Sequence, residues 1–204
     1  MALVNPNAPS GFRASRSLVR GPSSPIGGYY TLASAYATSL YQQDMLVPDG
    51  SGNVGLAAAA GAVVGTFKGV KYVDPTGNIV YANKWLASTA TQSGTVIEVE
   101  VEHDPWQCWF VQTSTSLTAA SQFKFVDLVA GTGNNFTGYS GQTVGSTGGV
   151  TFQVLRVIDS LAEMQLDSVT GHVGFGMSLT GTNAIVEVRA VKHHMLGSAG
   201  GITA

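Results

Sequence analysis

The chain has 204 residues, a formal net charge of −2 at pH 7 and only 11% charged residues, against about 25% in an average globular domain. A nearly neutral chain has no general electrostatic attraction for nucleic acid or for an anionic membrane, so we expect neither as a partner. The low charge density favours a surface that is covered in an assembly, because a protein that stays soluble alone usually carries more charge.

The first residues differ from the rest of the chain. Residues 1–28 hold four of the seven prolines and include Arg13, Arg16 and Arg20, with no acidic residue before Asp44. We expect an extended, cationic N-terminal arm; the alternatives are a disordered leader and an arm that orders on binding. The sequence does not open with a basic region followed by an apolar run, so we predict no signal peptide and expect synthesis in a cytoplasm. The most apolar window, residues 54–67, is too short for a membrane helix.

Residues 29–196 are expected to form one β-rich domain, and residues 197–204 a flexible tail. Turn signals separate strand candidates at 29–32, 45–48, 62–72, 79–85, 150–158, 161–166, 173–179 and 184–194. Residues 116–129 are predicted as the one short helix and residues 131–149 as a loop. The fold class is therefore all-β: an antiparallel β-sandwich or barrel-like domain with at most one or two short helices and an extended N-terminal arm.

Residues 94–115 form the stretch around which the domain is expected to be built. Apolar residues at 97, 99 and 101 alternate with Glu98, Glu100 and Glu102, which is the pattern of a half-buried strand. Asp104-Pro105 favours a turn, and an apolar run follows from Trp106, so we predict a β-hairpin. The glutamates form either a solvated face that discourages pairing with other strands or a docking surface for a basic partner.

Tests for catalytic and metal-binding motifs fail. The nearest match to G-x-S-x-G, at residues 138–142, lacks its last glycine, and the four histidines do not form a ligand cluster. We therefore expect no enzyme activity, no metal and no cofactor. Trp85 and Trp109 are expected in the core and Cys108 as a small buried hydrophobe. A carbohydrate- or receptor-binding module is the alternative, because tryptophans also stack on sugar rings.

Short motifs along most of the chain resemble a family of small virion proteins of tailed bacteriophages, the capsid decoration or cement proteins. These motifs occur in the order that such proteins use: residues 7–13, 28–30, 35–38, 74–77, 85–87, 104–106, 110–112, 131–134, 137–140 and 186–189, with His194.

The resemblance implies a β-rich, non-enzymatic protein that binds the assembled lattice of the major capsid protein on the outer surface of the virion. It also implies synthesis in the host cytoplasm and association with further copies of itself, for which we expect a trimer because capsids offer threefold positions. The residues expected to contact the capsid or a neighbouring copy are Arg13, Arg16, Arg20, Glu98, Glu100, Glu102 and Trp106.

Overall fold

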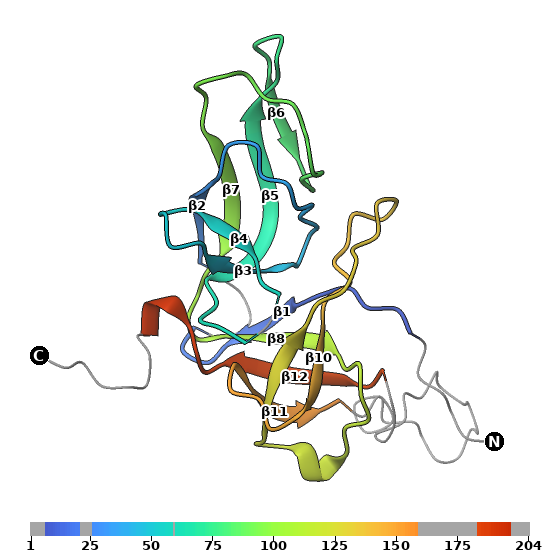
Figure 1. Cartoon of the computed structure of the whole chain (residues 1–204). Helices are drawn as coiled ribbons and strands as arrows, with labels where there is room; N and C mark the ends of the chain where they lie inside the picture. The colour runs from blue at the N-terminus through green and yellow to red at the C-terminus, as the bar shows by residue number, and fades with distance from the viewer. Residues whose placement is uncertain (1–6, 21–25, 59, 159–182, 197–204) are drawn as a thin grey trace, which may run out of the picture.

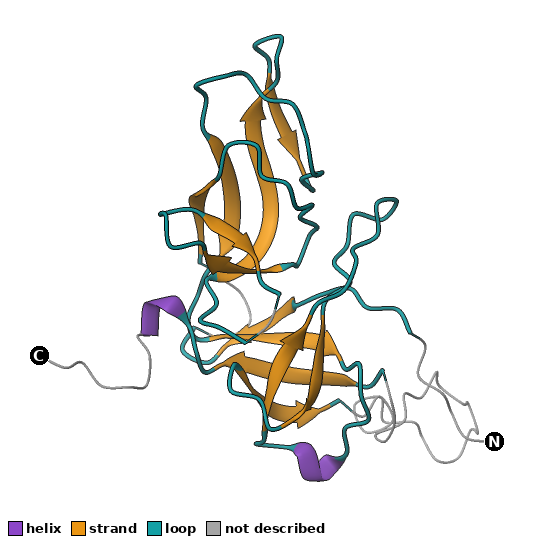
Figure 2. Ribbon diagram, viewed as in Figure 1, coloured by secondary structure: helices purple, strands orange, loops and turns teal. Residues whose placement is uncertain are grey.

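The computed structural model describes residues 7–20, 26–58, 60–158 and 183–196. Within these ranges the chain forms twelve strands and two short 3-10 helices, η1 (Ala119–Ser121) and η2 (His194–Leu196). The prediction of an all-β fold with a barrel-like part is confirmed (Figures 1 and 2). None of the helices in the described ranges has the length and apolar character needed to cross a membrane.

Six consecutive strands form the first sheet, which we call the barrel. They are β2 (Gly27–Leu32), β3 (Met45–Pro48), β4 (Val54–Leu56), β5 (Gly65–Val73), β6 (Ile79–Ala82) and β7 (Ile97–Glu102). The order is β3-β4-β2-β7-β5, and β3 also pairs with β5, which closes a five-stranded ring. Strand β6 extends the sheet from the second half of β5.

The second sheet, which we call the curled sheet, lies below the barrel in Figure 1. It contains β1 (Arg13–Ser17), β8 (Gln107–Gln112), β9 (Phe125–Val129), β10 (Thr143–Thr147), β11 (Phe152–Val157) and β12 (Ile185–Ala190). The order is β1-β8-β12-β11-β9-β10. A parallel bridge between Thr113 and Val144 brings β10 back to the end of β8, so this sheet also curls on itself.

The predicted hairpin of residues 94–115 is wrong, although both of its runs are strands. Strand β7 is paired on one edge with β2 and on the other with β5. Because both edges are occupied, β8 has no edge of β7 to pair with. The chain instead turns at Asp104-Pro105 and carries β8 into the curled sheet, where it pairs with β1 and β12.

Of the arm expected at residues 1–28, the described residues 7–20 belong to the folded unit rather than to a separate arm. Strand β1 pairs antiparallel with β8. Phe12 is fully buried and stacks on Phe152, with the ring centroids 5.0 Å apart. The first described strand, β1, therefore lies in the curled sheet, the next six strands form the barrel, and β8 returns to pair with β1.

Two other local predictions need correction, and three more fall outside the described residues. The predicted helix at 116–129 is the single turn η1 followed by strand β9, since β-branched and aromatic residues dominate its second half. The predicted loop at 131–149 contains β10. The strand candidates at 161–166 and 173–179 and the tail at 197–204 lie outside the described residues.

The barrel and the curled sheet share a buried junction. Met45, Ala57 and Val63, all from the barrel segment, pack in the same apolar cluster as the core of the curled sheet. The buried side chain of Gln142 joins the two parts, because its amide donates to the Ala57 carbonyl at 2.7 Å and its carbonyl accepts from the Met45 amide at 2.6 Å. Cys108, Trp85 and Trp109 are buried, as predicted.

Candidate functional site

The seven predicted contact residues do not form one surface. Arg13 is exposed on β1 opposite Phe110, while Arg16 forms an ion pair with Glu187 of the same chain. Arg20 and Trp106 lie at the end of the β1–β8 pair. The three glutamates lie on the barrel. The structure therefore offers one anchoring cluster and two exposed surfaces, which we describe in turn.

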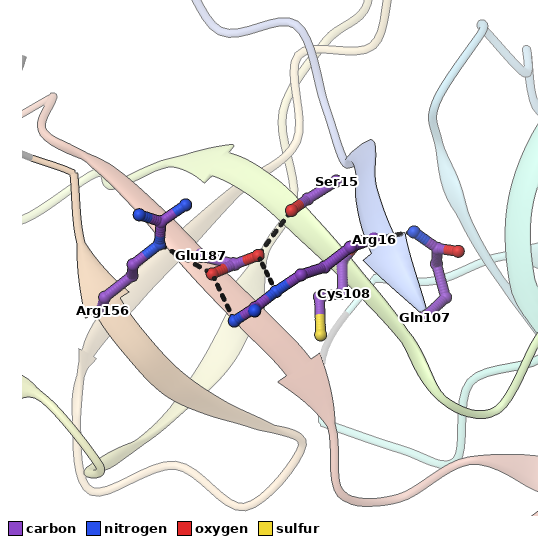
Figure 3. A network of polar contacts seen from close by, with 6 residues as sticks. All are labelled: Ser15, Arg16, Gln107, Cys108, Arg156 and Glu187. Carbon is purple, nitrogen blue, oxygen red and sulfur yellow. Dashed lines mark hydrogen bonds and ion pairs between the residues drawn. The ribbon is translucent and has the colours of Figure 1, made fainter. Parts of the chain in front are cut away.

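The anchoring cluster centres on Glu187, whose side chain is completely buried on β12 (Figure 3). Arg16 binds it with two donors, Nε to Oε1 at 3.0 Å and Nη2 to Oε2 at 3.2 Å. Arg156 donates its Nε to Oε2 at 2.8 Å, and the Ser15 hydroxyl donates to Oε1. Three strands, β1, β11 and β12, are thus tied together through one carboxylate.

The protonation of Glu187 follows from these contacts. Burial alone would raise the pKa of this carboxyl, but hydrogen bonds from Ser15, Arg156 and Arg16 outweigh burial and hold the pKa below its usual value. The carboxylate is therefore charged at neutral pH. Arg16 is consequently paired within the chain, where it holds β1 in the sheet. Its contact with a capsid or a neighbouring copy stays a prediction.

The first exposed surface is the Trp106 patch, made of Leu18, Val19, Arg20 and Trp106. The Leu18 amide donates to the Trp106 carbonyl at 2.9 Å, which places the backbones of the two residues side by side. All four residues are exposed, Trp106 at 42%.

Two side chains hold the backbone of this patch in place. Ser17 Oγ accepts from the amides of Val19 and Arg20 at 3.4 and 3.3 Å. The buried Asp104 accepts from the Trp106 amide at 2.9 Å. The patch therefore presents apolar, aromatic and cationic groups on a fixed backbone. Tryptophan and arginine, here Trp106 and Arg20, are among the residue types that dominate binding energy at protein interfaces.

The second exposed surface is the outer face of β2, β7, β5 and β6, which we call the tyrosine face. The strand register places Tyr29 beside Glu100 and then Gly69, and places Thr31, Glu98, Lys71 and Tyr81 in the next row. Tyr29 and Tyr81 are 69% and 74% exposed. A groove of about 310 Å³ lies between them.

Charges on the tyrosine face are balanced locally. Lys71 Nζ lies 2.7 Å from Glu98 Oε2. The pKa of Lys71 is raised by this hydrogen bond and by the charge of Glu98. Tyr29 and Tyr81 line the groove together with Lys71. Glu100 is exposed and lines the groove.

The expectation that Glu98, Glu100 and Glu102 share one exposed face of β7 is correct only in part. Glu102 is 1% exposed and binds Lys68 Nζ at 2.6 Å. Strand β5 supplies both lysines from its register beside β7, so the cations absent from residues 94–115 come from a neighbouring strand. A uniformly acidic docking stripe is therefore not present.

Two buried titratable groups lie at the junction of the barrel and the curled sheet. Burial raises the pKa of Asp44 to about 6, against the lowering effect of hydrogen bonds from Ser140 and the Tyr41 amide. Burial lowers the pKa of His193 to about 4. Across the part of the chain that the structure describes, no three His, Cys, Asp or Glu side chains gather as metal ligands would.

Comparison of the chain with protein-family models, with curated proteins and with solved structures finds no match. Sequence reasoning overlooked Glu187, Tyr29 and Tyr81. A signal was available for Glu187, because a single acid in the otherwise apolar and basic run of β12 needs a cationic partner when buried. Adjacent Tyr29 and Tyr30 also indicate that one of the two rings points outward on a strand.

Proposed function

We propose that the chain is a non-enzymatic capsid decoration or cement protein, which binds the outer surface of an assembled bacteriophage capsid lattice and stabilises the head. The motif resemblance suggests the class. The observation that carries the proposal is the Trp106 patch, because Leu18, Val19, Arg20 and Trp106 are exposed together on a backbone fixed by Ser17 and Asp104.

Anchoring of β1 supports this role. Residues 18–20 follow directly after β1, so their position depends on the ion pairs that hold β1 to Glu187. A patch that is already ordered loses less conformational entropy on binding than a free arm. We therefore place the main contact with the major capsid protein at the Trp106 patch rather than along a flexible arm.

The distribution of exposed apolar residues supports self-association. Besides the Trp106 patch, the structure exposes Phe123 and Phe125 near one end of the curled sheet and Phe136 on the β9–β10 loop. Separate apolar patches on a chain with few charges favour several interfaces in one assembly. We propose a homo-oligomer, most simply a trimer, docked on the capsid lattice.

Binding to the lattice stabilises the shell by mass action, because the protein binds the assembled form and not its separated subunits. The direct test is co-sedimentation with capsids that lack the protein. Trp106→Ala should weaken binding about thirtyfold, which corresponds to a hot-spot loss of about 2 kcal/mol. The control is Leu86→Ala, which truncates a similarly exposed residue on the barrel. Equal binding by Trp106→Ala and the unaltered chain would remove the proposed docking surface.

A further inference from the structure

The tyrosine face has features that docking through the Trp106 patch does not use. Tyr29 on β2 and Tyr81 on β6 stand at the two sides of the groove, with β7 and β5 between them. Neighbouring strands lie about 4.8 Å apart, so the two strands that carry the rings are about 14 Å apart. Gly69 lines the groove between these strands, and a Cβ at this position would lie 3.2 Å from the Ala82 carbonyl oxygen on β6.

The groove combines aromatic ring faces with both hydrogen-bond donors and hydrogen-bond acceptors. Its walls carry two tyrosine rings, and Lys68, Lys71, Asn83 and Glu100 add hydrogen-bond donors and acceptors along the lining. A volume of about 310 Å³ is at the lower end of the range of small-molecule sites. Such a lining fits a ligand that has apolar ring faces and many hydroxyl groups at its edges.

The charge balance narrows the class of ligand. Lys68 is paired with Glu102 and Lys71 with Glu98, and Glu100 adds a further negative charge to the lining. A polyanion such as nucleic acid, or a sulfated glycan, needs an excess of cations, which this face lacks. A neutral ligand with hydroxyl groups does not need an excess of cations, because its hydroxyl groups form hydrogen bonds with the lining without burying a net charge.

We propose that the groove between Tyr29 and Tyr81 binds a neutral saccharide, with hexose or N-acetylhexosamine rings stacked on the two tyrosines and their hydroxyl groups bonded to Lys71, Asn83 and Glu100. This site is separate from the Trp106 patch and does not depend on capsid binding. Its failure would leave the proposed decoration role untouched, and loss of capsid docking would leave this site untouched.

The test uses the purified full-length chain on an array that displays neutral, sialylated and sulfated glycans of bacterial and animal origin. Hits are then measured by saturation-transfer NMR and titration. We expect binding to neutral glycans, with ring protons closest to the protein. Tyr29→Ala and Tyr81→Ala should each reduce affinity by about tenfold, in line with the loss of an aromatic contact worth about 1.4 kcal/mol.

Two further variants distinguish loss of the ring contact from a general effect of substitution on folding. Tyr29→Phe retains the ring and should bind within about threefold of the unaltered chain. Tyr139→Ala removes an exposed tyrosine from the β9–β10 loop, outside the groove, and should leave binding unchanged. The proposal is overturned by a lack of binding to every neutral glycan, by binding confined to sulfated or sialylated glycans, or by equal affinity of Tyr29→Ala and Tyr139→Ala.

Discussion

Replacement of Glu187 by glutamine should detach β1 from the curled sheet. The buried carboxylate accepts hydrogen bonds from Ser15, from two nitrogens of Arg16 and from Arg156. Glutamine has nearly the same volume, but it has no charge and turns one of its two acceptors into a donor that faces the guanidinium groups. The change therefore tests the ion pairs without creating a cavity.

The expected loss follows from the burial of the partners. Breaking a fully buried ion pair costs about 3–5 kcal/mol, but the Arg16 and Arg156 side chains are 49% and 42% exposed and regain water when released. We therefore expect the free energy of unfolding to fall by about 2–3 kcal/mol. Urea denaturation followed by tryptophan fluorescence measures this loss, since Trp109 is buried in the same sheet.

A second readout separates local detachment from general weakening. Trypsin cleaves after arginine, so release of β1 should speed cleavage at Arg13 and Arg16 below the urea concentration of global unfolding. Glu100→Gln, at an exposed carboxylate, serves as the control and should change stability by less than about 0.5 kcal/mol. If Glu187→Gln matches this control in both stability and cleavage rate, Glu187 does not anchor β1.

Three further outcomes follow from the core and the junction. Phe12→Ala should lower the free energy of unfolding by about 3–5 kcal/mol, because its ring is fully buried against Phe152; a loss below about 1 kcal/mol in urea denaturation would show that the N-terminal segment is not part of the core. The stability that His193 contributes is present above its unfolded pKa of about 6.5 and is lost as pH falls through its folded value of about 4. His193→Gln should therefore flatten the loss of stability between these pH values, and an unchanged slope of urea midpoint against pH would contradict the buried neutral imidazole. The pKa of Asp44 has the opposite effect: its folded value of about 6 exceeds the unfolded value, so the stability that Asp44 contributes is lost as pH rises through 6. Asp44→Asn should therefore make the stability of the chain more sensitive to acid over this range. Greater resistance of the variant to acid would show that the pKa of Asp44 is not raised by folding.

Turn signals and the alternation of apolar and polar residues predicted many of the strands but not which strands pair with one another. The turn signals before β4 and before β6 are built as the sequence suggests, with Asp49 and Asp74 each accepting hydrogen bonds from amides two and four residues later. The alternation of apolar residues and glutamates in β7 also correctly predicted that Val99 lies in the core. Alternation describes the two faces of a strand, however, and carries no information on which strands occupy its two edges. The predicted hairpin failed for this reason.

Long-range pairing explains the remaining errors. Proline and arginine content made residues 1–28 resemble a free arm, whereas Arg16 is neutralised by Glu187, a residue 171 positions later. Glu102 looked solvent-exposed because its partner Lys68 comes from a different strand. The candidate surfaces were foreseen only in part. Trp106 and Arg20, which were predicted to contact a capsid or a neighbouring copy, are exposed, and their contact role stays a prediction. The tyrosine groove depends on four strands that only the fold brings together.

A cryo-electron reconstruction of virions that carry this protein tests the proposed function most directly. We predict density for the barrel and the curled sheet on the outer surface of the shell, in many symmetry-related copies, with Leu18 and Trp106 against the major capsid protein. Absence of the protein from the shell, or its presence there with the Trp106 patch facing solvent and touching neither capsid protein nor a neighbouring copy, would contradict the account.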